Sequence, residues 1–238
     1  MQYNIDSHVH IYKDFPSLEI IAAQSKAEKN ILFVLETRKT VTWHELLQKN
    51  SIKEISPGFA KFTHKQQTNY LIQGYQIITA EKLEVLALGM TDVIADGLSL
   101  SETVEKILKN NAIPVLPWSP GKWLGKRGDV LREFLSSTKK ESIFLGDIKG
   151  RPTTLVGGYF GLPKNNIFSL GFNNVSGSDP LPLDGEWKRI LTFGDTVSTQ
   201  AEVRNLEEAV KILCQSNLSF GEQECLVSCV KRNLLLRF

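Results

Sequence analysis

Short apolar runs alternate with segments of helical periodicity along most of this chain. Gln2–Asp6, Ile31–Glu36, Ile113–Pro117 and Ser142–Gly146 are runs with the length of strands. Apolar runs separated by helical patterns are typical of β/α units, in which successive strands pair in parallel. The pattern therefore predicts an α/β fold whose sheet is built mainly from parallel strands.

Several segments begin with a Ser, Thr or Asn that is followed three residues later by Glu. Such pairs occur at Thr42 and Glu45, Ser99 and Glu102, Asn205 and Glu208, and Ser219 and Glu222. The two side chains can satisfy backbone amides that the first turn of a helix leaves unpaired, so we expect a helix after each pair. Periodicity predicts further helices over Asp129–Ser137 and Lys164–Leu170.

One pair of strand-like segments is separated by only a short turn. Asn69–Thr79 and Leu83–Gly89 flank this turn, which predicts a hairpin, and Asn173–Ser176 is expected to be a last short strand. The expected number of strands is six to eight. No repeat or linker divides the chain, and α/β barrels of roughly 200–250 residues often form one domain. We expect residues 1–238 to form a single-domain, TIM-like β/α barrel.

Composition narrows the range of partners. Hydrophobic residues make up 42% of the chain, charged residues 23%, and the formal net charge is +2. This near-neutral balance does not favour nucleic acid as a partner. No apolar run approaches the roughly 20 residues of a membrane span, and the N-terminal segment lacks a signal-peptide pattern. We expect a cytoplasmic protein that does not bind membranes; the sequence leaves its oligomeric state open.

Asp6, His8 and His10 alternate along the first expected strand. In a regular strand a period of two puts all three side chains on one face. Imidazole binds Zn, Mn or Fe, and a nearby carboxylate can bind the same ion or orient a histidine. Two of the four histidines of the chain are in this segment. The alternation therefore predicts a metal site rather than an ordinary polar strand end.

The segment Ile5–His10 resembles the D-x-H-x-H motif that opens metal-dependent hydrolases, most of all the PHP (polymerase and histidinol phosphatase) superfamily. Three later segments resemble PHP motifs in the family's order. Gly74–Gly89 resembles a segment with a metal-binding Glu and His, Ile113–Trp118 resembles the P-V-x-A-H-P strand, and Gly177–Asp179 resembles G-S-D-x-H. The resemblance covers roughly residues 1–185 and implies a PHP-type distorted β/α barrel.

The chain departs from the PHP pattern at four positions. Gln76 stands where the family has Glu, and Glu84 stands where it has His. Trp118 and Leu181 replace two further histidines. A complete three-metal PHP site therefore cannot be built from this sequence.

The residues that remain imply a reduced, carboxylate-rich site. The expected metal ligands are Asp6, His8, His10 and Glu84, and the strand-end residues Asp147 and Asp179 are candidate catalytic bases. Such a set predicts one or two divalent ions. Its carboxylates favour Mn, Mg or Fe without excluding Zn.

The segment Pro117–Gly128 directly follows an expected strand and combines tryptophans, glycines and cations. Glycines let a ligand approach the backbone, cations attract an anion, and indole rings provide apolar walls. We expect Trp118, Lys122 and Arg127, together with Arg151 after the next strand, to bind a small anionic substrate such as a phosphorylated one. A surface loop whose tryptophan covers the core is the alternative.

Two classes of function follow from these residues. The first is a metal-dependent hydrolase, most readily a phosphoesterase, that activates water at the C-terminal mouth of the barrel. An amidohydrolase-type C–N hydrolase is its variant. The second is a non-catalytic binding or regulatory module on a degenerate barrel, which the replacements Trp118 and Leu181 favour.

Overall fold

The computed structural model describes residues 1–119, 122–123, 125–152, 171–216 and 218–235. The strands are β1 (Gln2–Val9), β2 (Lys29–Glu36), β3 (Glu54–Ser56), β4 (Phe59–His64), β5 (Gln67–Ile78), β6 (Glu84–Leu88), β7 (Ile113–Pro117), β8 (Phe144–Ile148), β9 (Asn173–Gly177), β10 (Gly194–Ser198) and β11 (Leu218–Phe220). The α-helices are α1 (Leu18–Ala22), α2 (Trp43–Lys49), α3 (Leu100–Lys109), α4 (Gly125–Ser137), α6 (Leu206–Leu213) and α7 (Leu226–Leu235). The short 3-10 helices are η1 (Lys140–Ser142) and η2 (Glu186–Arg189).

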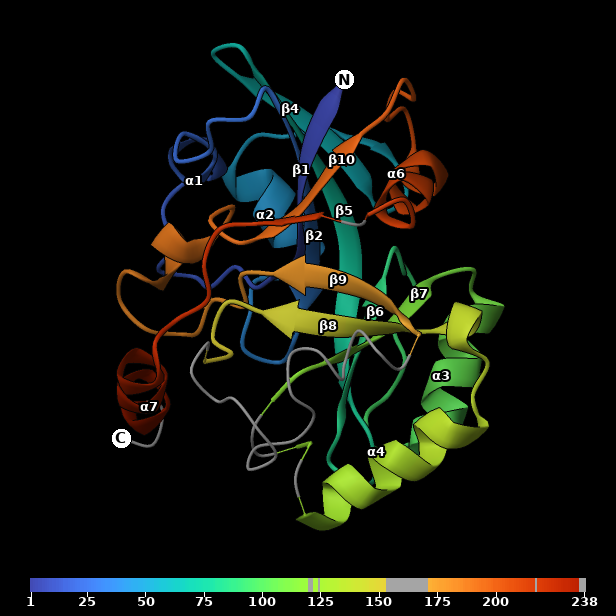
Figure 1. Cartoon of the computed structure of the whole chain (residues 1–238). Helices are drawn as coiled ribbons and strands as arrows, with labels where there is room; N and C mark the ends of the chain where they lie inside the picture. Colours follow the sequence, from blue (N-terminus) through green and yellow to red (C-terminus); the bar gives the residue numbers. More distant parts are fainter. Residues whose placement is uncertain (120–121, 124, 153–170, 217, 236–238) are drawn as a thin grey trace.

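The described strands form one sheet that curls into a nearly closed barrel (Figure 1). Its order is β11-β10-β1-β2-β5-β6-β7-β8-β9, with β3 and β4 attached beside β5. The two sides of the gap meet where β9 returns to β1. There the hydroxyl of Ser7 donates to the carbonyl of Ser176 at 2.8 Å. The expectation of a barrel-like α/β fold is confirmed at this level.

The pairing of the strands is mixed, so the expectation of a mainly parallel sheet is only partly right. β1 with β2, β2 with β5, β7 with β8, and β8 with β9 are parallel pairs. The pairs of β6 with its neighbours β5 and β7, and of β1 with β10, are antiparallel. The expected hairpin of β5 and β6 is confirmed, because so short a turn cannot carry a parallel crossover.

Most helix starts follow the sequence signals. Capping boxes form at Thr42 and Ser99, and the side chain of Asn205 caps α6. The helix expected after Ser219 is wrong, because Leu218–Phe220 pairs with β10 as β11 and α7 begins only at Leu226. The helix expected over residues 164–170 lies outside the described residues.

The sheet also has more strands than expected. It contains eleven among the described residues, against the six to eight of the sequence pattern. The short strands β3, β10 and β11, and the partly exposed β4, carry no continuous apolar run, so hydrophobic periodicity did not single them out.

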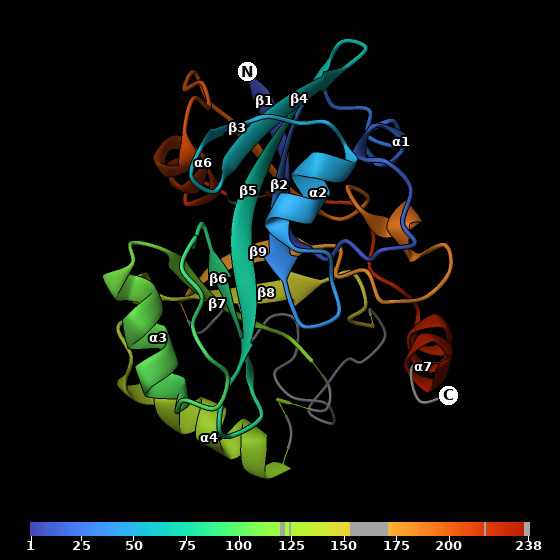
Figure 2. The same ribbon diagram turned by 180° about the vertical axis from the view of Figure 1, so that it is seen from behind.

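Buried side chains form three layers, and alternate residues of β2 show how they are divided. Ile31, Phe33 and Leu35 belong to the core inside the barrel. Leu32 and Val34 belong to a layer between the sheet and the helices α1 and α2. A third layer packs α3 and α4 against the outer face of the sheet over β6, β7 and β8, as seen from behind in Figure 2. Both faces of β2 are therefore buried, which explains its unbroken apolar run.

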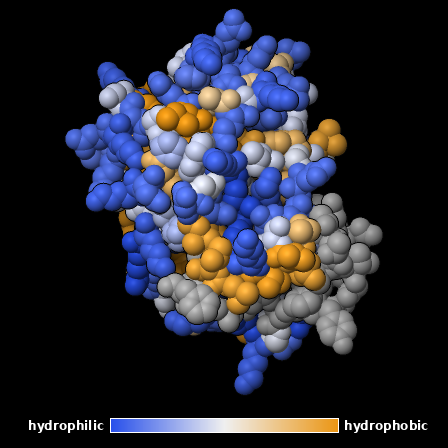
Figure 3. Space-filling model, turned by 90° about the vertical axis from the view of Figure 1, so that its left-hand side faces the viewer, coloured by the Kyte–Doolittle hydropathy of each residue, from blue (hydrophilic) through white to orange (hydrophobic). Residues whose placement is uncertain are grey.

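The helix α7 lies at the edge of the barrel and keeps part of its apolar surface in solvent. Its exposed apolar side chains are Leu226, Val227, Val230, Leu234 and Leu235. Figure 3 shows apolar surface gathered on the face where α7 lies. None of the described helices has both the length and the apolar character that crossing a membrane requires.

Candidate metal centre

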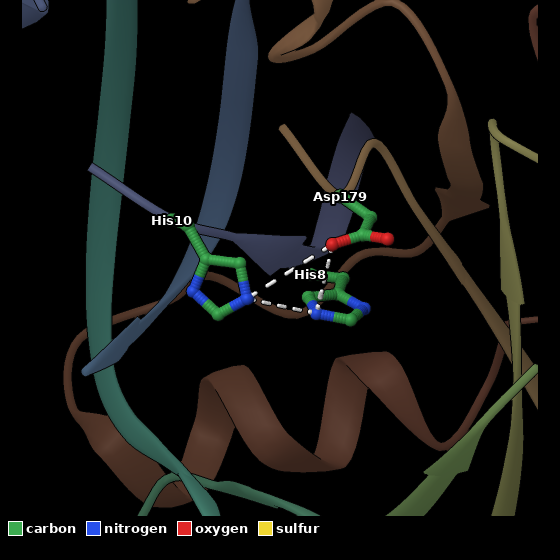
Figure 4. A group of neighbouring side chains, drawn as sticks. All are labelled: His8, His10 and Asp179. Carbon is green, nitrogen blue, oxygen red and sulfur yellow. Dashed lines mark hydrogen bonds and ion pairs between the residues drawn. The ribbon is translucent and has the colours of Figure 1, made fainter. Parts of the chain in front are cut away.

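Two histidines and one aspartate meet at the mouth of the barrel. His8 and His10 come from the end of β1 and its exit, and Asp179 follows β9. The Nε2 atoms of the histidines are 3.1 Å apart, and Oδ1 of Asp179 lies 3.4 Å from Nε2 of His8 and 4.0 Å from Nε2 of His10. Figure 4 shows the three groups pointing toward one another. Among the described residues, this trio can offer ligand atoms that all lie within 4.8 Å of one another.

A β-bulge in β1 brings the two histidines to the inside. Between Asp6 and Val9, β1 advances three residues while β2 advances two, from Leu32 to Val34. Asp6 and Val9 therefore both pair with residues whose side chains lie in the outer layer, and the histidine between them turns inward. The expectation that Asp6 shares one face with the histidines is wrong, because it assumed a regular strand.

Asp6 instead supports the closure of the barrel. Its fully buried carboxylate accepts the backbone N–H groups of Ser178 at 2.8 Å, Leu191 at 2.9 Å and His8 at 3.3 Å. Burial raises the pKa of Asp6 to about 6, although these hydrogen bonds oppose the shift. Asp6 lies outside the trio of candidate ligands.

The neighbours of His10 fix the direction of its ring. Nδ1 lies 3.0 Å from the carbonyl oxygen of Leu35, which can only accept a hydrogen bond. Nδ1 therefore carries the proton when the ring is neutral, and Nε2 keeps a free lone pair for a metal. The amide oxygen of Gln76 lies 3.1 Å from the same Nε2. Gln76, which the sequence marked only as a departure from the PHP pattern, thus borders the site.

Electrostatics favours the forms of these groups that bind metals. Burial lowers the pKa of His8 to about 4, with the nearby Asp179 opposing this shift. Burial alone would raise the pKa of Asp179, but the cationic forms of the two histidines, with Arg232 and Lys122, bring it below its usual value. His8 is therefore neutral and Asp179 ionised near neutral pH, as metal ligands must be.

The left-handed backbone of Asp179 turns its carboxylate toward the histidines. Its φ is 46°, a conformation that Asp tolerates better than most residues. Its N–H donates to the carbonyl of His8 at 2.9 Å, so the two residues are joined through both backbone and side chain.

A cavity of about 950 Å³ opens above the trio. Trp118, Lys122 and Glu84, which the sequence analysis assigned to the site, line this cavity. However, Glu84 forms an ion pair with Lys122 and takes no part in the trio. Trp118 is buried and also packs in the layer of α3 and α4, as the alternative interpretation of this segment expected, and its role toward a ligand stays a prediction.

Three other expected site residues lie away from this cavity. Arg151 donates two hydrogen bonds of 2.7 Å to Asp147, and the amide of Gln223 completes this buried cluster. Neither Asp147 nor Arg151 lines the cavity. Arg127 is exposed on α4 and only reaches the carbonyl of Lys82 at 3.5 Å. The carboxylate of Asp147 is held in this cluster by Arg151, four residues further along the chain.

Tyr12 and Arg232 are among the cavity residues that the sequence analysis did not assign to the site. Tyr12 continues the alternation of His8 and His10 by one further step, so the period of two could have found it. Burial raises the pKa of Tyr12 above its usual value, which keeps its hydroxyl protonated as a hydrogen-bond donor. Arg232 comes from α7, far from any strand end, and no sequence signal pointed to it.

The comparisons with known proteins support the fold. No family model matches the chain, and no curated relative was found. Among solved structures, PsfC from Pseudomonas syringae PB-5123 superposes with a TM-score of 0.55 at 12% identity, over 99% of this chain and 98% of that one. At this level of identity the likeness concerns the fold alone.

Endonuclease Q is a second structural neighbour. The lesion-specific enzyme PfuEndoQ from Pyrococcus furiosus superposes with a TM-score of 0.59 at 13% identity, over 98% of this chain and 66% of that one. A complex of Endonuclease Q with a 27-mer duplex carrying an abasic lesion at the active site gives 0.58 at 13% identity, over 98% and 67%. This chain thus spans about two thirds of Endonuclease Q. At 13% identity this likeness, too, concerns the fold alone.

Proposed function

We propose that this protein is a metal-dependent hydrolase that acts on phosphoesters. The observation that carries the proposal is the trio of buried His8 and His10 with the partly exposed Asp179, which lines an open cavity. The likeness in fold between this chain and the lesion-specific endonuclease PfuEndoQ points in the same direction.

The donor set fits a divalent ion. Ligands that bind one ion at about 2.0–2.2 Å lie roughly 3 Å from one another, close to the shorter separations within the trio. Two imidazoles and one carboxylate with further positions open suit Fe, Mn or Zn. An ion held there would supply Lewis-acid chemistry, activating water and polarising the phosphoryl group.

The side chains around the trio have distinct tasks in this proposal. The carbonyl of Leu35 holds the ring of His10 in the orientation that presents Nε2 to the ion. Asp179 is partly open to the cavity, with 18% of its side chain exposed, so its second oxygen can accept the proton of the attacking water. Asp147, the other base proposed from the sequence, is occupied by Arg151 and Gln223. Asp179 is therefore the better candidate.

A non-catalytic binding module is the second candidate function. It is favoured by Gln76, whose neutral amide borders the trio where the PHP pattern has a carboxylate. A neutral amide oxygen binds a divalent ion more weakly than a carboxylate does. The bound ion, or the cavity without it, would then serve recognition only.

Metal content and turnover separate these functions. Wild-type protein, purified without chelators, should contain a transition metal by elemental analysis, and His10→Ala should lose it. His44→Ala is the matched control, because His44 is exposed on α2. The metal-loaded protein is then assayed on phosphomonoesters, phosphodiesters and small amides with Mn²⁺, Fe²⁺, Zn²⁺ and Mg²⁺.

Each outcome decides between the candidates. Metal-dependent turnover of a phosphoester that His10→Ala abolishes supports the hydrolase. Bound metal without turnover on any substrate of the panel favours the binding module. Equal metal content in wild type and a folded His10→Ala variant contradicts the proposed centre.

A further inference from the structure

A buried arginine of the C-terminal helix lines the cavity and has unused hydrogen-bond donors. Arg232 of α7 lines the cavity, and only 9% of its side chain is exposed. Its Nε and Nη1 atoms are buried and have no hydrogen-bond partner among the described residues. A guanidinium gives up its hydrogen bonds to water when it is buried. Without protein partners this costs free energy, unless a ligand restores the hydrogen bonds.

The carboxylates nearest to Arg232 do not satisfy these donors. Its Nη1 lies 3.6 Å from Glu186 and 3.8 Å from Glu224, beyond hydrogen-bonding distance. Both glutamates also form ion pairs with Arg189. The pairs hold Arg232 in place electrostatically and leave the hydrogen-bonding capacity of its Nε and Nη1 atoms unused.

A glycine makes room for the guanidinium. A Cβ atom added at Gly150, which also lines the cavity, would lie 2.8 Å from Nη2 and 3.3 Å from Cζ of Arg232. Gly150 does not have the left-handed φ that would itself penalise alanine. An alanine here would therefore displace the flexible end of Arg232 while leaving its charge in the protein.

The charges of the cavity wall balance one another before any metal binds. The carboxylates among the described lining residues are Glu36, Glu84, Asp96 and Asp179, and the cations are Arg38, Lys39, Lys122 and Arg232. These four acids and four cations cancel. A divalent ion at the trio would then leave an excess of two positive charges, which complements a dianion.

We propose that Arg232, assisted by Lys122, binds the terminal phosphate of a small phosphomonoester beside the trio. This inference rests on the proposed function and specifies its substrate class. A guanidinium presents two parallel donors that match two phosphate oxygens, and the ammonium of Lys122 acts as a point charge.

The charge of the ligand favours a monoester over a diester. A phosphomonoester approaches a charge of −2 above its second pKa of about 6. A phosphodiester carries one negative charge per phosphate, and its chain continues on both sides. The balanced charges of the described cavity residues and the net charge of only +2 for the whole chain do not favour a polymer of such groups.

Binding of two simple probes to Mn²⁺-loaded protein tests the inference. Calorimetry at constant ionic strength compares the binding of methyl phosphate with that of dimethyl phosphate. The second methyl group removes one negative charge and one terminal acceptor oxygen. Wild type should bind methyl phosphate more tightly. Arg232→Gln and Gly150→Ala should each weaken that binding by about 10- to 100-fold, the usual range for a charge-assisted hydrogen bond. Arg204→Gln is the matched control, because the Arg204 side chain is 70% exposed.

Metal content, measured in every sample, keeps the two proposals apart. Undiminished methyl phosphate binding in a folded Arg232→Gln or Gly150→Ala variant overturns the arginine subsite. Tighter binding of dimethyl phosphate, or of a duplex DNA oligonucleotide, overturns the monoester class. If wild type holds no metal but Arg232→Gln still weakens phosphate binding, the subsite stands and the hydrolase proposal fails. If Arg232→Gln does not fold, Gly150→Ala decides.

Discussion

Asp179 and His8 are 171 positions apart in the sequence, yet they meet through two contacts. The N–H of Asp179 donates to the carbonyl of His8 at 2.9 Å, and its Oδ1 lies 3.4 Å from Nε2 of His8. The first contact joins the backbone that follows β9 to β1, and the second assembles the candidate metal ligands. Closure of the barrel and formation of the site are therefore one structural event.

Gly177→Ala should disrupt both the closure and the site. An added Cβ would lie 2.4 Å from the backbone nitrogen of His8, and a backbone atom cannot move aside cheaply. We expect a loss of about 1–3 kcal/mol in the free energy of unfolding, together with reduced metal content. Urea unfolding and elemental analysis measure these effects. Gly185→Ala is the control for metal content only: its Cβ would meet nothing within 4 Å, but its φ of 75° strains alanine and lowers stability by itself. Normal metal content in a Gly177→Ala protein would separate closure from the site.

Glu84→Gln distinguishes the ion pair of Glu84 from the metal role that the sequence suggested. The substitution removes the counter-charge of Lys122 in the cavity. We expect unchanged metal content and a several-fold gain in phosphate affinity, because the charge of Lys122 is no longer neutralised by Glu84. A loss of metal would instead restore Glu84 to the ligand set.

Gln76→Glu should strengthen metal binding. The amide oxygen of Gln76 already lies 3.1 Å from Nε2 of His10, so a carboxylate there would add a charged ligand next to the trio. We expect about a tenfold or greater fall in the dissociation constant for Mn²⁺, measured by competition with a chelating dye. An unchanged constant would mean that position 76 does not reach the ion.

Arg151→Ala should act on stability and leave the metal centre intact. It would leave the carboxylate of Asp147, which Arg151 holds with two hydrogen bonds of 2.7 Å, without its counter-ion. Breaking a buried ion pair in this way costs about 3–5 kcal/mol. Denaturant unfolding should show this loss, and Asp147→Asn/Arg151→Met should recover part of it. A folded Arg151→Ala protein that keeps its stability but loses phosphate binding would support the original substrate role of Arg151.

Asp195 should make the protein less stable as pH rises from about 4 to 7. Burial raises its pKa to about 7, although hydrogen bonds from Ser176 oppose the shift. An unfolded Asp ionises near pH 4, so folding favours the protonated form. The stabilisation is complete below pH 4 and is lost as pH rises through 7. Unfolding free energies of Asp195→Asn should vary less over this window than those of the wild type. Asp129→Asn, at an exposed site, should behave like the wild type. Identical pH profiles for wild type and Asp195→Asn would contradict this assignment.

The sequence determined those features that depend on near neighbours along the chain. The strands β2 and β7, the hairpin of β5 and β6, and the caps at Thr42 and Ser99 follow from local apolar runs and side-chain-to-backbone bonds. The candidate ligands His8, His10 and Asp179 were also visible, because their motifs are short.

Only the tertiary structure decided which polar residues share the site. A one-residue bulge, set by the pairing of β1 with β2, separated Asp6 from the histidines that follow it. Side chains far away in the sequence occupy two of the other expected site residues. Lys122 pairs with Glu84, and Gln223 joins Arg151 at Asp147. Arg232 entered the cavity because α7 packs beside the mouth. Strand register, ion pairing and helix packing depend on atoms far apart along the chain, so periodicity and motif spacing could not reveal them.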